Sequence, residues 1–433
     1  MAFYKNIYGE IYDFARFRNG EKIHTEINGV PVLILQRIED ADHVLRTNSS
    51  NYKKNMAWFR QAFGFSRFSE DGDAWRIRHK LTHSHLTQFD RQRVFEAAEE
   101  YAEIAFDELI ERGEHGTKVI DDSVLHTLTI SVLMKVFFEI SLDDTKIDIN
   151  VLSRFIDIGS QYTFVPPGKI GELYRESVAE ISDLRGEVLA GFREFRTGRL
   201  PISPMLRDLL DADADPNSTV VLEHELVSFL SAGAETTAAG ISWALYLLGL
   251  YPDIQEEIRQ EVMKFWNSET PDHFRLSKLA KLGGFLSETL RLYPPTPVIS
   301  RIAIKDDAIS GTPVKSGDIV VVSIIGIQHD LRLRPDPWRL DISEASPSQR
   351  ASGTAMAFSF GPRVCGGKHF ALMEMMTILA VLLRKGRVEL TSYEQPQFRW
   401  KSLILRDGGQ PVRIAPLKHD DDKKFHDEIL AEG

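Results

Sequence analysis

The chain has 433 residues, of which 43% are hydrophobic and 10% aromatic, and this is enough to bury a large core. Its formal net charge of −11 argues against nucleic acid and against an anionic membrane surface as partners. The single cysteine excludes a disulfide framework, and the N-terminal residues hold no apolar run long enough for a signal peptide or a membrane anchor, so we expect a cytoplasmic protein.

The first part of the chain combines a short strand with a segment that is dense in aromatic side chains. Residues 31 to 36 are predicted to form a strand after a turn at residues 28 to 29. Residues 56 to 68 then include Phe63 and Phe65, at a spacing that is not helical. Taken by itself, such a segment suits ordinary core beneath a loop.

A helix is predicted to begin at about Gly72. Trp75 and His79 lie one turn apart in it and share a face. His79, His83 and His85 could also be interpreted as metal ligands, because His at i and i+4 can share a metal. No further ligand stands at a supporting spacing, so we favour a solvated helix face over a zinc site.

Helical patterns continue through the middle of the chain. Residues 92 to 114 and 119 to 141 are predicted to be amphipathic helices. The breakers at residues 166 to 168 then separate two helical patterns, with Phe164 just before them, and a plain interhelical loop is the simplest interpretation. Residues 211 to 219 indicate a polar linker.

The longest predicted helix runs from about Thr219 to Tyr251, and Pro252 ends it. Its middle is SAGAETTAAG, so small side chains would let another group approach the helix backbone closely. Gly233 costs about 1 kcal/mol relative to alanine in a helix, and its presence therefore needs a reason. Close packing against another helix would be one such reason.

The next two helices carry a buried-looking charge pair. Residues 252 to 267 are predicted to be amphipathic, and Ser277 is predicted to cap the helix that ends at Tyr293. This second helix contains Glu288 and Arg291, one turn apart. Such pairs contribute little on a surface, but this one stands in an otherwise apolar helix.

Strands are predicted near the C-terminal end. The segments VISRIAI, residues 298 to 304, and DIVVVSIIG, residues 318 to 326, have the composition of strands. Short strands are also expected between residues 386 and 414, before a polar tail at residues 416 to 433.

The stretch FSFGPRVCGGKHFA, residues 358 to 371, holds the only cysteine, Cys365. Helical spacing begins just after it, so the thiol stands at a helix N-terminus, where free backbone N–H groups and the helix dipole favour the thiolate. Gly366 and Gly367 have no side chains, so a large flat group could approach the sulfur. Taken alone, the cysteine favours the interpretation as an inert buried thiol.

This stretch resembles the haem-binding loop of the cytochromes P-450. The family pattern Phe-x-x-Gly-x-x-x-Cys-x-Gly is matched by Phe358, Gly361, Cys365 and Gly367. The family also has Ala/Gly-Gly-x-Asp/Glu-Thr-Thr/Ser in its longest helix, and the matching residues here are Ala232, Gly233, Glu235, Thr236 and Thr237.

Two further motifs of the family follow in its order. The Glu-x-x-Arg pair is matched by Glu288 and Arg291, and Arg339 matches the second arginine that joins them in a buried structural network. The family often has Trp-x-x-x-Arg at Trp75, but the fourth position here is His79, whose charge would depend on pH.

The resemblance covers residues from about 30 to 415 and implies the cytochrome P-450 fold. That fold is mainly α with a smaller β part, an α-rich lobe and a β-rich lobe around a buried haem. We therefore expect a single haem domain over residues 1 to 415 and a polar tail over residues 416 to 433.

The resemblance also implies roles for individual residues. Cys365 would be the axial ligand of haem b, and thiolate ligation favours O–O cleavage. Thr236 and Glu235 would form a proton path over the iron. Further contacts to the haem would come from Trp75, His79, Arg301, Phe358, Gly361, Arg363, Gly367, Ala232 and Gly233. The substrate would be contacted by Phe63, Phe65, Phe164, Phe229, Val298 and Ile299.

The implied function is a haem-thiolate monooxygenase that inserts one oxygen atom from O2 into a hydrophobic small molecule. Fatty acids, terpenoids and polyketides are all open as substrates. A peroxide-driven hydroxylase of the same fold is an alternative, but such enzymes usually lack the acid–threonine pair. A haem-thiolate sensor or binding protein is another, and it would need no proton path.

Electrons would have to come from a separate donor, because no flavin or iron–sulfur motif follows the haem domain. A ferredoxin or flavodoxin-type protein with its reductase is expected. The basic residues Arg76, Arg78, Lys80 and Lys368 flank motifs on the cysteine side, so we expect an acidic donor to dock there.

Overall fold

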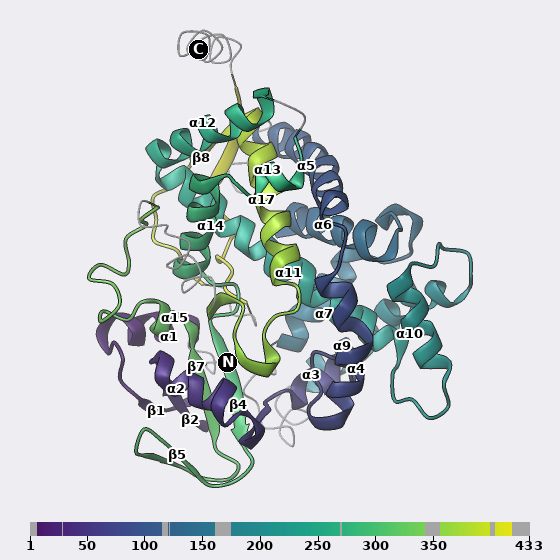
Figure 1. Ribbon diagram of the computed structural model, residues 1–433, viewed down its shortest axis with the longest axis vertical. Coiled ribbons are helices and arrows are strands. Elements are labelled where there is room, and N and C mark those ends of the chain that lie inside the picture. Colours follow the sequence, from purple (N-terminus) through teal and green to yellow (C-terminus); the bar gives the residue numbers. More distant parts are fainter. Residues whose placement is uncertain are drawn as a thin grey trace.

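Helices make up most of the molecule, and a smaller sheet lies at one end (Figure 1). The computed structural model describes residues 7–27, 29–114, 120, 122–160, 175–268, 271–342, 356–398 and 403–417. The mainly α fold with a smaller β part that the sequence predicts is confirmed. Phe164 and the tail from residue 418 onward lie outside the described residues.

The first helices in chain order are α1 (Ile7–Phe17), α2 (Ile38–Asp42), α3 (Ala57–Phe63), α4 (Gly72–Thr87), α5 (Arg91–Glu114), α6 (Asp122–Leu133), α7 (Ile149–Ser160) and α9 (Arg175–Phe192). The later ones are α10 (Pro204–Ala214), α11 (Leu222–Leu250), α12 (Pro252–Ser268), α13 (His273–Leu276), α14 (Ala280–Leu292), α15 (Ile324–Gln328) and α17 (Lys368–Lys385). The strands are β1 (Ile23–Ile27), β2 (Val30–Leu35), β3 (Tyr52–Lys54), β4 (Val298–Ala303), β5 (Asp307–Ile309), β6 (Thr312–Val314), β7 (Ile319–Ser323), β8 (Gly386–Leu390) and β9 (Val412–Pro416).

The main sheet joins strands near the N-terminus to strands from residues 298 to 323. Its strand order is β1-β2-β7-β4-β3, with β2 parallel to β7 and the other pairs antiparallel. Four of the five β7 residues are buried, as expected of a central strand that is covered on both faces. Figure 1 shows α1, α2 and α15 beside this sheet. Two smaller pairs, β5–β6 and β8–β9, complete the β part.

The core is built around α11. This helix is apolar almost all round, and such a helix has to be buried. Trp243 in it is fully buried and donates its indole N–H to the carbonyl of Ile404 at 3.0 Å. Figure 1 shows α11 and α17 crossing in the middle of the helical part, with α5, α6, α12 and α14 around them.

Three predicted boundaries are wrong. Ser277 follows α13 as its C-cap residue and does not cap α14, whose N-cap position is Leu279, because α13 is a separate short helix before α14. α10 extends to Ala214 into the expected polar linker. α11 begins at Leu222 and not near Thr219, because the carbonyl and hydroxyl of Thr219 instead accept hydrogen bonds from Arg78. Within the described residues, no helix is both long and apolar enough to cross a bilayer.

Candidate active site

The loop that carries Cys365 is fixed by its backbone. A short turn at Gly361–Arg363 precedes the cysteine, whose N–H donates to the carbonyl of Phe358 at 2.9 Å. Gly361 has φ +78°, and a Cβ at this position would collide with the carbonyl oxygen of Leu45. Only glycine suits both conditions, which explains the glycine of the motif. The sulfur therefore stands just before α17.

Cys365 as a residue is exposed, although protein atoms around its thiol desolvate the sulfur. This desolvation raises the pKa of the thiol above its ordinary value, against the opposing effects of the Gly367 N–H and the charges of Arg67 and Lys368. The backbone N–H groups at the helix N-terminus lower the pKa of the thiol, as expected, but desolvation outweighs them. Coordination to a metal ion deprotonates a thiol outright.

An accessible stripe interrupts the buried surface of α11. Phe229, Gly233 and Thr236 are partly exposed and Ala232 is exposed, whereas nearly all of their neighbours on the helix are buried. These positions are i, i+3, i+4 and i+7, so they share one face. The ring of Phe229 contacts the ring of Phe137, with 5.1 Å between their centroids. Phe137 in turn contacts Phe370 at the start of α17, with 4.9 Å between the centroids.

Gly233 packs closely against α6. A Cβ at this glycine would collide with the side chain of Leu133, and the hydroxyl of Thr129 donates to the carbonyl of Ala234 at 3.0 Å. Helix packing therefore accounts for the glycine in the small-residue stretch, and the accessible face next to it is a separate property of the same segment.

The acid and the threonine of this stretch have different environments. Glu235 is buried, with 8% of its surface exposed, whereas Thr236 lies in the accessible stripe. The hydroxyl of Thr236 donates to the carbonyl of Ala232 at 2.7 Å, as threonines in helices often do. Its oxygen can still accept a hydrogen bond from a group beside the stripe.

Four cations from distant parts of the chain gather near Asp71. Lys54, Arg67, Arg301 and Arg363 act on one another electrostatically. Asp71 acts on Lys54, Arg301 and Arg363, whereas Glu225 acts on Arg67 and Glu70 acts on Arg363. Asp71 accepts from the Arg363 guanidinium at 2.8 Å and from the Lys54 backbone N–H at 3.0 Å. Positive charge thus exceeds negative charge at this cluster.

The charged forms of the cations in this cluster are destabilised by burial. Burial lowers the pKa of Lys54 well below its ordinary value, with further lowering by Arg301 and Arg363. Burial also lowers the pKa of Arg301 to about 10. Nη1 of Arg363 is buried without a hydrogen-bond partner among the described residues. Carboxylates bound at this cluster would raise these lowered pKa values and would give Nη1 of Arg363 a hydrogen-bond acceptor. The two propionates of haem are such carboxylates.

Trp75 and His79 belong to the same region. The guanidinium of Arg363 lies 3.9 Å from the centre of the Trp75 ring, and the Trp75 and His79 rings are 4.7 Å apart. Desolvation, Arg67 and neighbouring cations lower the pKa of His79 to about 4. His79 is therefore neutral at pH 7, and its charge changes with pH only in the acid range.

The histidines of α4 do not form a metal site. His79 and His83 stack face to face at 4.4 Å, and His85 bonds to Asp208 at 2.7 Å. No group of three metal-ligating side chains is found anywhere in the described ranges.

Sequence reasoning missed Lys54 and Arg67. Lys54 ends strand β3, and Arg67 lies in the loop between α3 and α4, where neither stands in a motif. Arg67 donates to the hydroxyl of Thr82 at 2.8 Å, which places its guanidinium beside α4. A basic residue within an aromatic loop was the only available signal, and it does not distinguish a binding residue from a surface one.

The residues expected to contact substrate lie in different environments: one is in the core, one is at the surface and three are partly exposed. Phe63 is only 2% exposed and packs on Phe59 and Phe155, so it is core. Phe65 is 52% exposed at the surface. Val298 and Ile299 on β4, like Phe229, are partly exposed and remain available to line a pocket.

The charge network on α14 is buried, but its second arginine differs from the expected one. Arg291 binds Glu288 at 2.7 Å, and both side chains are buried. Arg334 approaches Glu288 at 3.3 Å. Arg339 contributes only its backbone carbonyl, which accepts from Arg291 at 2.9 Å, because its side chain is turned to the exposed surface.

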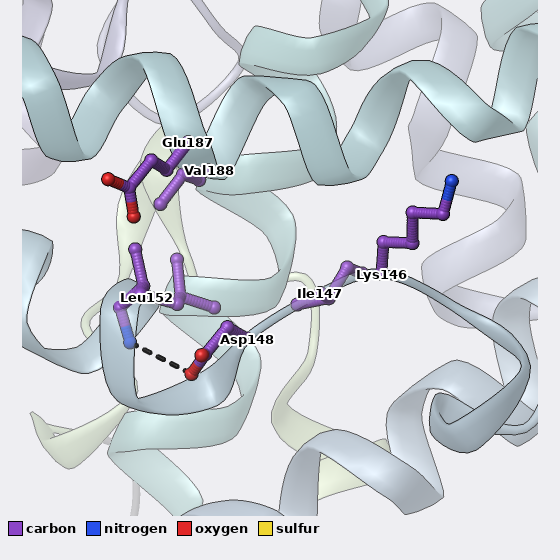
Figure 2. Close-up of a pocket in the computed structure, with 7 residues that line it drawn as sticks. Lys146, Ile147, Asp148, Leu152, Glu187 and Val188 are labelled. Carbon is purple, nitrogen blue, oxygen red and sulfur yellow. Dashed lines mark hydrogen bonds between the residues drawn. The ribbon is translucent and has the colours of Figure 1, made fainter.

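A small pocket lies away from all these residues. It has a volume of about 180 Å3 and lies between the segment before α7 and helix α9. Figure 2 shows Leu152 and Val188 near Glu187 on one side of the pocket, and Lys146 on the other side beside Ile147, with its side chain extending away from Glu187. None of the residues proposed for catalysis lines it.

Comparison with known proteins agrees with this geometry. The family model described as Cytochrome P450 matches residues 6–410. Human Cytochrome P450 4F11 is 33% identical over 214 residues, which is 48% of this chain and 41% of that protein. Mouse Leukotriene-B4 omega-hydroxylase 3 is 36% identical over 215 residues, with the same coverage of 48% and 41%. The chain thus matches less than half of the length of these relatives.

A solved structure shares the fold over almost the whole chain. It is described as the crystal structure of cytochrome P450DA heme domain, and it superposes with a TM-score of 0.79 at 20% identity, covering 95% of this chain and 93% of that one. At this identity the match shows the fold alone. Because the family model spans nearly the whole chain and the fold agrees, this chain belongs to the cytochrome P450 family.

Proposed function

We propose that the protein is a haem-thiolate monooxygenase that inserts one oxygen atom from O2 into a hydrophobic small molecule. The observation that carries this proposal is the exposed Cys365, next to α17, together with the accessible stripe on α11 and the cluster of cations. Haem b is the cofactor that suits this arrangement, within a single domain over residues 1–415. The lone cysteine supports a cytoplasmic location.

The residues of the chain would divide the work. Cys365 would bind the iron. Arg301, Arg363, Trp75 and His79 would hold the propionates. Phe358, Gly361 and Gly367 would shape the loop under the macrocycle, and bound haem would supply the activation of dioxygen. The hydroxyl of Thr236 would accept and pass on a proton, which Glu235 would resupply.

A lipid with a long acyl chain is the first substrate class to test. Phe229, Val298 and Ile299 are partly exposed and would give a substrate pocket an apolar lining. The relative named Leukotriene-B4 omega-hydroxylase 3 acts, by its name, on a lipid, and this supports the same class here. A spectral binding screen that sets fatty acids against terpenoids and polyketides would decide the class.

A peroxide-driven hydroxylase is the second candidate. The pair Glu235–Thr236 argues against it, because an enzyme supplied with peroxide needs no such pair to deliver protons. A haem-thiolate sensor would likewise need neither the pair nor an electron donor. Turnover with reductase and donor, compared with turnover by peroxide, separates the three functions.

Thr236→Ala is expected to uncouple reductant consumption from product formation. The variant should bind haem and substrate normally, because only a hydroxyl is lost, but it should release hydrogen peroxide in place of product. General acid–base groups contribute about 10²- to 10⁴-fold to a rate, so the ratio of product to reductant should fall roughly tenfold or more. The ratio is measured with the folded, haem-loaded protein.

Thr237→Ala is the matched control for Thr236→Ala. Its hydroxyl also donates to the carbonyl one turn earlier, Gly233, at 2.9 Å, but the side chain is buried. The control should keep the wild-type ratio. Equal ratios in both variants would show that Thr236 is a structural threonine.

We further propose that an acidic ferredoxin or flavodoxin-type donor docks beside the cysteine loop. Arg76 and Lys80 are exposed on α4, where Ile77 is also 57% exposed, and Val364, which directly precedes Cys365, is 47% exposed. Arg78 was expected to belong to this surface, but it is buried and binds Glu225 at 2.8 Å, so it cannot contact a donor directly.

Reduction of the haem by the donor should slow as salt rises. Screening shortens to about 8 Å at 0.15 M ionic strength, and steered association loses roughly tenfold or more when its charges are screened. Stopped-flow reduction measures the rate, and Arg76→Glu should lower it at low salt. Lys315→Glu, at the β5–β6 hairpin, is the control and should leave the reduction rate unchanged. A rate that neither salt nor Arg76→Glu changes would place the donor elsewhere.

A further inference from the structure

A contact among α3, α9 and α11 has no part in the proposed chemistry. The guanidinium of Arg185 on α9 reaches in two directions: Nη2 lies 3.1 Å from Nε2 of His224 on α11, and Nη1 donates to the backbone carbonyl of Gln61 on α3 at 3.3 Å. Arg185 thereby ties together three helices. Within the described part of the chain, it has no carboxylate at ion-pair distance.

The end of α3 is shaped to receive the His224 ring. Gly64, which directly follows α3, has φ +89°, and a Cβ there would lie 2.5 Å from Cγ and Nδ1 of His224. Both the conformation and the close contact require glycine. Nδ1 of His224 is buried, with no hydrogen-bond partner among the described residues. The ring is therefore held by packing on one side and by Arg185 on the other.

The contact depends on the protonation state of the ring. Nε2 can accept from the Arg185 guanidinium only when the imidazole is neutral and carries its proton on Nδ1. A second proton would turn this hydrogen bond into a contact between two cations. We propose that Arg185, His224 and Gly64 form a clasp that fastens α3 to α9 and α11 and opens when His224 is protonated.

The surrounding charges support a neutral ring in the closed clasp. Burial lowers the pKa of His224, and so do the charges of Arg185 and Arg78, whereas Glu223 and Asp213 raise it. Both of these carboxylates are already paired with Arg196. A histidine whose pKa is lowered in the closed state binds fewer protons there. The clasp is thus fully stable above the ordinary pKa of about 6.5 and weakens as the pH falls below it.

Opening would free the chain that leads to the cation cluster. Arg67 follows Gly64 by three residues, and its position next to α4 depends on the loop that the clasp holds. The clasp alone predicts that the loop between α3 and α4 becomes less ordered as the pH falls. Any effect on substrate entry would rest, in addition, on the proposed monooxygenase function.

Backbone hydrogen exchange of the haem-loaded protein at pH 7.5 and 5.5 tests the clasp, with rates corrected for the intrinsic effect of pH. One proton changes an equilibrium by at most about tenfold per pH unit, so protection of residues 57 to 70 should fall up to roughly tenfold at pH 5.5. Protection of α17 should stay unchanged, which excludes general acid unfolding.

Three variants make the test specific. His224→Gln keeps an acceptor for Arg185 but cannot take a charge, so residues 57 to 70 should stay protected at both pH values. Arg185→Gln removes the donor and should lower their protection at both. His85→Gln, which alters a histidine paired with Asp208 on α4, should behave as wild type.

Either of two results would overturn the clasp. One is a loss of protection in His224→Gln at pH 5.5 equal to that of wild type, and the other is unchanged protection in Arg185→Gln. Neither readout depends on turnover, so failure of the clasp and failure of the proposed monooxygenase activity would be told apart.

Discussion

Cys365→Ala is expected to abolish the long-wavelength absorption band that the reduced, carbonyl-bound protein should show. Thiolate ligation places electron density on the iron, and no other side chain can replace the sulfur because this is the only cysteine in the chain. The variant should also lose monooxygenase activity completely, since O–O cleavage depends on that ligand. The difference spectrum between the reduced and the reduced, carbonyl-bound protein is the measurement.

His369→Ala is the matched control for the cysteine variant. His369 is exposed, four residues after Cys365 in the same loop and helix, so its loss tests whether any change there disturbs the haem. The control should keep the long-wavelength band. If Cys365→Ala kept it as well, the assignment of the axial ligand would be refuted, and the proposed function with it.

Glu288→Ala is expected to destabilise the protein by about 3–5 kcal/mol, because it leaves the buried guanidinium of Arg291 without its carboxylate. Much of the variant should be recovered unfolded and without haem. The free energy of unfolding is obtained from denaturant titration, with haem content measured beside it. A stable variant fully loaded with haem would contradict the role of this pair.

An exposed pair of the same spacing is the control. Glu21 and Arg18 are also separated by three residues, and both side chains are about half exposed. Glu21→Ala should cost no more than about 1 kcal/mol, because such pairs contribute little in water. The double variant Glu288→Ala/Arg291→Met should recover part of the lost stability, since it removes the uncompensated charge as well.

Local patterns predicted the parts of this molecule that depend on neighbours in sequence. The periodicity of apolar residues predicted α11, about three residues too early at its start, and the start of α17, and the motif around Cys365 predicted the turn and glycines that present the thiol. These features follow from backbone geometry and from side chains within one or two turns, so sequence suffices for them.

Features that depend on folding could not be predicted in the same way. Lys54, Arg67, Arg301 and Arg363 come from four separate segments, and only the folded chain brings them to Asp71. The exchange of Arg339 for Arg334 has the same origin, because the path of the backbone decides which side chain faces α14. The raised pKa of the Cys365 thiol reflects desolvation, which no sequence motif encodes.

The order in which the main sheet is completed bears on how the protein is made. β2 pairs in parallel with β7, Val32 opposite Ile319, so the partner of an early strand is synthesised 287 residues later. At about 5–20 residues per second, β2 would wait roughly 15 to 60 s on the ribosome with one edge unpaired. An isolated hairpin such as β1–β2 is marginal in water, and its open apolar edge can pair with another nascent chain. Recombinant yield should therefore respond to translation speed and to chaperones that cover this hairpin.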